Sequence, residues 1–104
     1  MRFLDGVYRL CRKIPKGKVT TYKILAEKLG TKAHRAVGQA MKLNKDAPRT
    51  PCHRVVLSNG AVGNYSGKNG VKGKIKLLKK EHIKTAGGNK NSKIIDFEKK
   101  LYRF

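Results

Sequence analysis

The sequence predicts a mainly α-helical domain with a small β-hairpin, and its 104 residues suit one domain with a modest core. Two stretches repeat apolar residues at helical spacing, one over residues 3–14 and one over residues 71–83. Between them, Asn59-Gly60 separates two short apolar runs, which is the strongest short-range signal of a hairpin. These observations define the fold class.

The first predicted helix covers residues 3–14. Pro15 ends its pattern, whose apolar positions are Phe3, Val7, Leu10 and Ile14. Cys11 lies beside Val7 on the apolar side, so we interpret it as a core residue and not as a reactive one.

Two shorter helices are predicted next, over residues 20–29 and 32–43, with Thr20 as the cap of the first and Gly30 in the turn between them. Two short helices joined by a tight turn resemble a helix-turn-helix. The second helix has Arg35 near its start and is rich in small residues, namely Ala33, Ala36, Gly38 and Ala40. Small side chains allow close approach either to a neighbouring helix or to a DNA groove that Arg35 enters, and the basic composition favours DNA.

The remaining chain contains a loop, a helix and a tail. The loop over residues 63–67 is bounded by glycines and either folds back towards Cys52 or is an ordinary surface loop. The helix over residues 71–83 carries Glu81, which either pairs with Lys84 at helical spacing or orients a catalytic histidine. We expect one body over residues 1–86, followed by a linker and an apolar tail over residues 87–104 that docks on the same body.

The chain is strongly basic, with 26 Lys and Arg against 6 Asp and Glu and a net charge of +20. Such an excess predicts a polyanionic partner, most commonly nucleic acid, although lysine-rich proteins also exist whose charge only keeps them in solution. No apolar run approaches the roughly 20 residues that span a bilayer, and the first residues lack the apolar stretch of a signal peptide. Two cysteines make neither a metal quartet nor a disulfide framework. We therefore expect no metal, no cofactor and no membrane partner, in a cytoplasmic or nucleoid-associated monomer.

The segment Pro51-Cys52-His53-Arg54 is the best candidate for chemistry. The thiolate is the reactive form of cysteine, and positive neighbours or a helix N-terminus lower the thiol pKa. Pro51 is suited to open a short helical turn in front of the cysteine. The tetrapeptide alone leaves two interpretations open, a nucleophile and a small buried thiol.

Five stretches together resemble the O6-alkylguanine-DNA alkyltransferases, also called methylated-DNA-protein-cysteine methyltransferases. They are Gly17-Lys18-Val19-Thr20-Thr21-Tyr22 with Leu25-Ala26, then Arg35-Ala36-Val37-Gly38 with Ala40-Met41 and Asn44, then Pro51-Cys52-His53-Arg54-Val55-Val56, then Gly60-Ala61-Val62-Gly63-Asn64-Tyr65-Ser66-Gly67, and finally Leu77-Leu78 with Glu81. The resemblance covers roughly residues 3–83 in the family's order. It implies the winged helix-turn-helix of the family's C-terminal domain, so that residues 1–86 form an alkyltransferase DNA-binding and active-site domain.

The resemblance also implies a reaction and a role for each matching residue. The family binds duplex DNA through the minor groove, flips an O6-alkylated guanine out of the stack and transfers the alkyl group irreversibly to cysteine, and chemistry on a base does require the base to leave the stack.

Cys52 resembles the acceptor, His53 its base acting through water, Glu81 the group that orients His53, and Asn44 the brace of the active-site turn. Tyr22 resembles the hydroxyl that protonates the leaving guanine and crowds the adjacent phosphate. Arg35 resembles the finger that fills the vacated stack, on a recognition helix that includes Ala36 and Gly38. The carbonyls of Cys52 and Val55 resemble acceptors for the guanine amino group, and Tyr65 and Ser66 the loop that closes over the base.

The chain departs from the family in three respects. It has no room for the usual N-terminal domain, the stretch over residues 68–74 is slightly longer, and residues 84–104 lie outside the common core. One-domain relatives, the alkyltransferase-like proteins, bind alkylated DNA without repairing it, and typically carry tryptophan where this chain has Cys52. The absence of tryptophan therefore favours the enzyme over a lesion sensor. A third interpretation is a basic chromosomal or regulatory DNA-binding protein in which Cys52 is structural.

Overall fold

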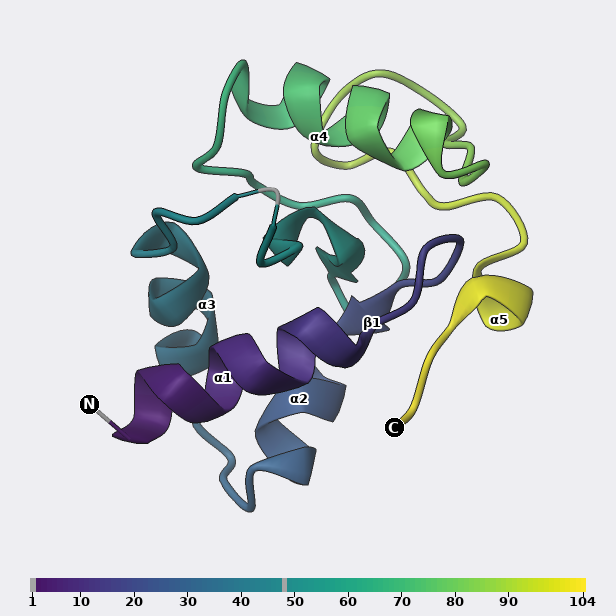
Figure 1. Cartoon of the computed structure of the whole chain (residues 1–104). Helices are drawn as coiled ribbons and strands as arrows, with labels where there is room; N and C mark the ends of the chain where they lie inside the picture. The colour runs from purple at the N-terminus through teal and green to yellow at the C-terminus, as the bar shows by residue number, and fades with distance from the viewer. Residues whose placement is uncertain (1, 48) are drawn as a thin grey trace.

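The computed structural model describes residues 2–47 and 49–104 and is mainly helical (Figure 1). Its helices are α1 (Arg2–Lys13), α2 (Tyr22–Lys28), α3 (His34–Lys42), α4 (Gly70–Lys80) and α5 (Phe97–Lys100), together with one turn of 3-10 helix, η1 (Cys52–Arg54). The strands are β1 (Thr20–Thr21) and β2 (Val55–Val56). The predicted class, mainly α with a small β element, is confirmed.

The β element is a parallel ladder and not the predicted hairpin. Thr20 pairs with Val55 and Thr21 with Val56. The turn at Asn59-Gly60 does form, and the Leu57 N–H donates to the Ala61 carbonyl at 2.9 Å. Beyond the turn, however, Ala61 bridges Lys93 of the tail, and the Val62 N–H donates to the Ser92 carbonyl at 2.9 Å. The tail therefore supplies the partner for residues 61–62 that the hairpin prediction assigned to residues 55–57.

The helices differ from the predicted ranges at their ends. α2 begins at Tyr22 because Thr20 and Thr21 form β1. Thr21 is therefore the cap, and its side-chain oxygen accepts a hydrogen bond from the Ile24 N–H at 3.0 Å. α4 ends at Lys80, and His82 then adopts a left-handed backbone conformation with φ 66°. This early end places Glu81 at the helix terminus.

β2 lies between two apolar clusters. Val55 belongs to the cluster formed with α1, α2 and α3, whereas Val56 belongs to the cluster formed with α4 and the tail. Successive residues of a strand point to opposite faces, so a strand of two residues is enough to join both clusters. Cys11 is 0% exposed in the first cluster, which confirms its interpretation as a core residue. Cys52 belongs to the same cluster, so the candidate nucleophile lies against the core formed with α1, α2 and α3.

The tail runs back over the body (Figure 1). The Val19 N–H donates to the Lys100 carbonyl at 2.9 Å, and the Tyr102 N–H donates to the Val19 carbonyl at 2.7 Å. Ile94 is buried in the second cluster. The division of the chain at residue 86 stays a prediction. Within the described residues, no helix has both the length and the apolar composition needed to cross a membrane.

Candidate active site

Cys52 opens the turn η1 and is almost completely buried, with 4% of its surface exposed. Pro51 directly precedes the turn, and the Arg54 N–H donates to the Pro51 carbonyl at 2.9 Å. Burial raises the pKa of the Cys52 thiol, and the Asn44 side chain and the charge of Lys74 partly oppose this rise. The thiol therefore depends on a nearby base to give up its proton at neutral pH.

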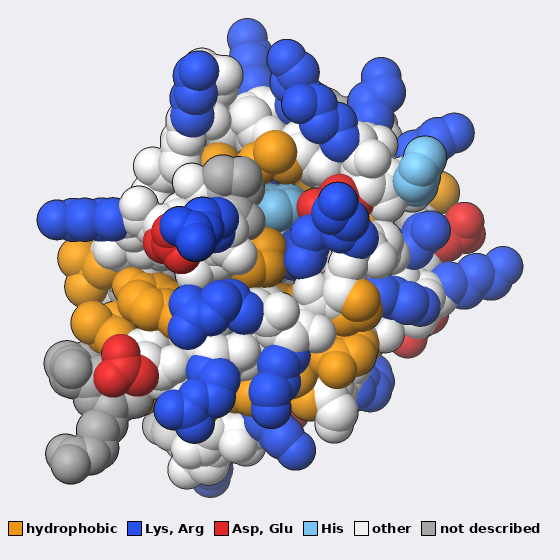
Figure 2. Space-filling model, viewed as in Figure 1, with side chains coloured by type: hydrophobic (Ala, Val, Ile, Leu, Met, Phe, Trp, Pro, Cys, Tyr) orange, Lys and Arg blue, Asp and Glu red, His pale blue; other side chains and the backbone are white. Residues whose placement is uncertain are grey.

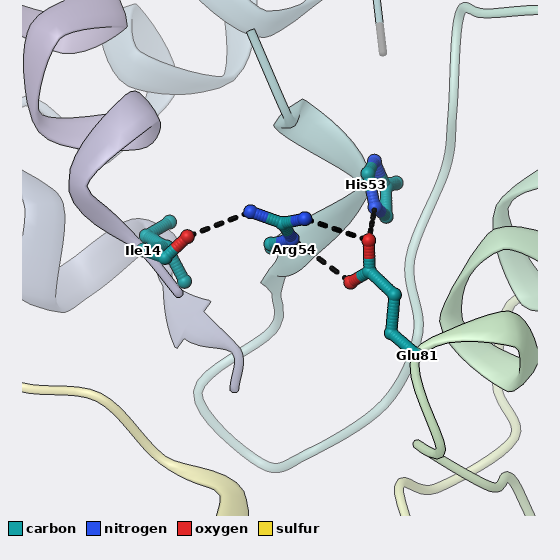
Figure 3. Close-up of polar contacts among 4 residues, drawn as sticks. All are labelled: Ile14, His53, Arg54 and Glu81. Atoms are coloured by element: carbon teal, nitrogen blue, oxygen red, sulfur yellow. Dashed lines mark hydrogen bonds and ion pairs between the residues drawn. The ribbon is translucent and has the colours of Figure 1, made fainter. Parts of the chain in front are cut away.

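His53 is buried beside a carboxylate. Its Nε2 lies 3.1 Å from Oε2 of Glu81, and because a carboxylate oxygen only accepts, Nε2 carries the proton and Nδ1 holds a free lone pair (Figure 3). Nδ1 is buried and has no hydrogen-bond partner among the described residues. Burial lowers the pKa of His53, although Glu81 acts in the opposite direction. The ring is therefore a neutral imidazole with an unused basic nitrogen next to the cysteine in sequence.

Glu81 also binds Arg54, a residue to which the sequence analysis gave no role. The guanidinium donates twice, from Nε to Oε1 at 2.8 Å and from Nη2 to Oε2 at 2.7 Å, and its Nη1 donates to the Ile14 carbonyl at 2.7 Å (Figure 3). Burial raises the pKa of Glu81, but the hydrogen bonds from Arg54 and His53 outweigh it and the net shift is downward. Glu81 is therefore a fixed anion that holds the two residues of the turn that follow Cys52. The signal for Arg54 was its place directly after Cys52 and His53.

Asn44 reaches the chain segment in front of the cysteine. Its Nδ2 donates to the Thr50 carbonyl at 2.9 Å, and its Oδ1 accepts the Asp46 N–H at 2.9 Å. The Thr50 carbonyl also accepts the Cys52 N–H at 2.8 Å. The loop over residues 44–52 is thus closed on itself by side-chain and main-chain bonds.

A cleft of about 1140 Å³ opens in front of Cys52. Of the predicted site residues, those that line it are Tyr22, Arg35, Gly38, Cys52, Tyr65 and Ser66. His53, Glu81, Asn44, Val55 and Ala36 are not part of the lining. Lys90 and Asn91 of the tail also line the cleft, and the sequence analysis did not identify them because it placed them in a flexible link. Burial raises the pKa of Tyr22 to about 12, so its hydroxyl keeps its proton and remains a donor.

Lys74 is a further residue that the sequence analysis missed. It is 0% exposed, and its Nζ donates to the carbonyls of Val55 at 2.8 Å, Val62 at 2.6 Å and Asn64 at 3.2 Å. One lone pair of the Val55 carbonyl is therefore already used, so the predicted contact with a guanine amino group requires the other. The available signal was helical spacing, because Lys74 lies three residues after Val71 and four before Leu78, on the inner side of α4.

The described residues contain no group of three or more His, Cys, Asp or Glu side chains that could hold a metal ion. The arrangement instead combines a buried thiol and a protonated tyrosine at the cleft with a neutral imidazole and a fixed carboxylate behind the cysteine turn. A thiol near a base that a third group orients is the general pattern of nucleophilic catalysis, which makes Cys52 the candidate nucleophile.

Comparison with known proteins identifies the family. A model of the "6-O-methylguanine DNA methyltransferase, DNA binding domain" family matches residues 2–83. The chain belongs to this family. It is 46% identical over 87 residues to a methylated-DNA--protein-cysteine methyltransferase of Candida glabrata, a match that covers 79% of this chain and 41% of the relative. The chain thus spans less than half the length of that relative.

Two solved structures have the same fold. S. pombe Atl1, solved in complex with damaged DNA containing O6-carboxymethylguanine, superimposes with a TM-score of 0.84 and 27% identity, covering 99% of this chain and 96% of Atl1. Mycobacterium tuberculosis OGT, solved in complex with DNA, superimposes with a TM-score of 0.73 and 35% identity, covering 78% of this chain and 50% of OGT. The likeness to Atl1 includes the tail, whereas the likeness to OGT covers a smaller part of this chain.

Proposed function

We propose that the protein repairs DNA directly by accepting the alkyl group of an O6-alkylguanine on Cys52. The observation that supports this proposal most strongly is the buried Nδ1 of His53, which has no partner among the described residues while Nε2 is held by Glu81. This nitrogen belongs to the residue directly after Cys52 and is free to take a proton, as the transfer reaction requires. Each molecule acts once, because the thioether that forms is stable.

The chemistry is a displacement at the alkyl carbon. The sulfur of Cys52 forms a bond to that carbon, the bond from carbon to O6 breaks, and its electron pair passes to the guanine. The thiol proton passes to Nδ1 of His53 through a water molecule, and the Tyr22 hydroxyl supplies a proton to the leaving guanine ring. The proton on His53 then returns through water to the Tyr22 oxygen, so the net products are alkylated Cys52 and unmodified guanine. Glu81 orients His53, and Asn44 braces the segment before Cys52.

The duplex is placed by α3. Arg35 and Gly38 lie on the cleft side of this helix, beside Ala36, and we assign to them the minor-groove surface, with Arg35 filling the gap left by the flipped base. Tyr65 and Ser66 close over the base. The relatives solved with DNA support this partner. The partner is therefore double-stranded DNA that contains O6-alkylguanine.

The alternative is a lesion sensor that binds alkylated DNA without reaction. The likeness to Atl1 over 99% of the chain favours it, and the intact Cys52 and His53 oppose it. Intact mass after incubation with a duplex containing O6-methylguanine separates the two. Transfer adds one methyl group in place of a proton, and the modified peptide must be the one with Cys52 and not the one with Cys11. An unmodified protein bound to this duplex would establish the sensor.

Cys52→Ser should abolish alkyl transfer and leave duplex binding intact, because an alcohol is a far weaker nucleophile than a thiolate at neutral pH. The measurement is methyl transfer from labelled duplex, with binding followed by fluorescence anisotropy. Cys11→Ser is the matched control, since Cys11 is buried in the core and burial raises its pKa to about 12. Methyl transfer by the Cys52→Ser protein would show that another residue is the acceptor.

A further inference from the structure

The peptide in front of Cys52 is held at a single residue, Thr50. Its carbonyl accepts the Cys52 N–H at 2.8 Å and Nδ2 of Asn44 at 2.9 Å, so both lone pairs of this oxygen are used. The Thr50 N–H donates to the Asp46 carbonyl at 3.0 Å. Thr50 is 1% exposed. Any movement of Thr50 therefore reaches the cysteine through one hydrogen bond.

The Thr50 hydroxyl lies between two opposite charges. Nη1 of Arg12 donates to Oγ1 at 2.9 Å, and Oγ1 lies 3.0 Å from Oδ2 of Asp46. A guanidinium only donates and a carboxylate only accepts, so the single hydroxyl proton must point to Asp46. Both bonds involve an ionised group, and such bonds are the stronger ones. The rotation of the Thr50 side chain is consequently fixed from both sides.

Arg12 connects this group to the N-terminal helix. It lies in the last turn of α1, and the carbonyl of Ile14, two residues further on, accepts Nη1 of Arg54 at 2.7 Å. Arg12 thus contacts Thr50, which precedes the turn η1, and Ile14 contacts Arg54, the last residue of the turn. Residues at and just after the C-terminus of α1 therefore hold the cysteine turn on both sides. This region of the chain carries none of the predicted site residues.

We propose that Thr50 is a positioning residue, whose hydroxyl, held between Arg12 and Asp46, keeps Cys52 at the place from which it attacks the alkyl carbon. This inference rests on the proposed function. A displacement requires the attacking atom to be aligned with the breaking bond, and a misplacement of about 1 Å can cost about 100-fold in rate. Valine has the shape of threonine and would fill the same buried space, so packing alone does not require the hydroxyl.

The test compares Thr50→Val, Thr50→Ser and Arg12→Gln with the unchanged protein. Arg9→Gln is the matched control, because Arg9 is an exposed arginine of the same helix with none of the bonds described above. Three quantities are measured: the rate of methyl transfer from a duplex with O6-methylguanine, the affinity for that duplex, and the pH profile of Cys52 alkylation by iodoacetamide in the protein alone. Peptide mapping separates Cys52 from Cys11.

We expect Thr50→Val to slow methyl transfer about tenfold or more, with unchanged duplex affinity and a displaced pH profile of Cys52 alkylation. Arg12→Gln should slow transfer in the same direction, Thr50→Ser should restore most of the rate, and Arg9→Gln should behave like the unchanged protein. Transfer by Thr50→Val at the unchanged rate would overturn the inference. Equal slowing by Thr50→Ser would also overturn it, because the methyl group and not the hydroxyl would then be responsible.

The iodoacetamide profile keeps this inference separate from the proposed function. If the unchanged protein transfers no methyl group, the proposed function fails, and the profile still reports whether the Thr50 hydroxyl positions Cys52. If the unchanged protein transfers the methyl group and the profile of Thr50→Val is the same as its own, only the positioning role fails.

Discussion

Lys74 is the residue whose burial has the clearest energetic consequence. Within the described part of the chain, no carboxylate lies within 4.0 Å of its Nζ, and its donors meet three carbonyl oxygens. An ammonium has three N–H donors, which matches these acceptors in number. Burial nevertheless lowers the pKa of Lys74 to about 7. The native protein therefore releases this proton at a lower pH than the unfolded chain, in which lysine titrates near its ordinary value of about 10.4.

Lys74→Met should change how stability depends on pH. Between about pH 7 and pH 10.4 the unfolded chain holds the lysine proton and the native state does not, so this lysine makes the free energy of unfolding rise with pH across that window. Below pH 7 both states hold the proton, and its contribution is constant. Urea unfolding of both proteins from pH 7 to pH 10 measures the effect. The difference, unchanged protein minus variant, should rise with pH, and the contributions of Cys11 and Tyr22 cancel in it. Cys52 interacts with Lys74, so both proteins are compared with Cys52→Ser in the background. Parallel curves for the two proteins would contradict the lowered pKa.

At the scale of single residues, the sequence predicted the neighbours of Cys52 better than it predicted the buried Lys74. Glu81 and His53 were matched through the family resemblance, and the structure places their side chains at hydrogen-bond distance, although the orienting role of Glu81 stays a prediction. Lys74 was missed because it is one of many lysines in the chain and nothing in the sequence separates a buried lysine from a solvated one. Its burial depends on carbonyls of the segments over residues 55–64, which no local pattern brings next to α4.

At the scale of elements, the small residues of α3 fall into two groups, one that packs inside the protein and one that lines the cleft. Ala40 is 1% exposed and its carbonyl accepts the Tyr8 hydroxyl at 2.8 Å, so Ala40 serves packing against α1. Gly38 lines the cleft, and a Cβ added there would meet no atom within 4 Å. Packing inside the protein therefore does not require glycine at position 38. The open space at this position is compatible with the DNA-facing role proposed for this side of α3.

Gly38→Ala should stabilise the fold and weaken duplex binding. Alanine is favoured over glycine within a helix by about 0.5–1 kcal/mol, and the added methyl group has free space in the protein. The same methyl group would hold the helix away from the floor of a minor groove. Thermal unfolding and anisotropy titration measure the two effects. A loss of stability would contradict the open space around Gly38, and unchanged binding would remove this residue from the DNA surface.

Arg35→Ala should reduce base flipping more than it reduces plain duplex binding. Arg35 is exposed on the cleft side of α3, and its proposed task is to fill the space of the extruded base. A fluorescent base analogue at the lesion reports flipping, and anisotropy on an unmodified duplex reports binding. Arg9→Ala is the control, because Arg9 is an exposed arginine that does not line the cleft. Unchanged flipping in Arg35→Ala would end the finger role.

The helices α1 and α4 were predictable because their apolar residues recur along 12 and 11 residues, whereas β1 and β2 have only two residues each. The four residues of α5 are too few to show a period, and the sequence did not predict this helix. No periodicity exists in two residues, and β1 pairs with a segment far along the chain. The Asn59-Gly60 turn was predicted from local chemistry and does form. Its strand pairing was wrong because the competing partner, the tail around Lys93, was treated as a flexible link.

At the scale of the whole molecule, positive charge dominates the surface. On the face shown in Figure 2, lysine and arginine side chains project over the helices and around the rim, and acidic side chains are few. The ion pairs among the described residues occupy only Arg49, His53 and Arg54. Lys74 is buried, and exposed lysine and arginine side chains without an ion pair can meet phosphates. Affinity for DNA should therefore depend on charge over the whole body, and discrimination should come from the base that fits beside Cys52.

Duplex binding should be strongly salt-dependent and almost independent of sequence. If about five phosphates are neutralised, the slope of log affinity against log salt should be about −4 to −5. The minor groove offers a degenerate pattern of donors and acceptors, so small residues on α3 have little sequence to distinguish. Titrations on unmodified duplexes of different sequence, at several salt concentrations, measure both properties. A flat salt response, or a strong preference for one unmodified sequence, would indicate a regulatory DNA-binding protein instead.

The pairing of β1 has a consequence for the order of folding. The Thr20 hydroxyl donates to the Tyr102 carbonyl across 82 residues of sequence, and β1 directly precedes Tyr22, which lines the cleft. At about 5–20 residues per second, a ribosome adds those 82 residues in roughly 4–16 s. Helices such as α1 form from local contacts within microseconds, whereas contacts between distant residues form late. During synthesis, therefore, the contact between Thr20 and Tyr102 and the cleft wall that Lys90 and Asn91 supply form only after the residues of α1 to α4 have been made.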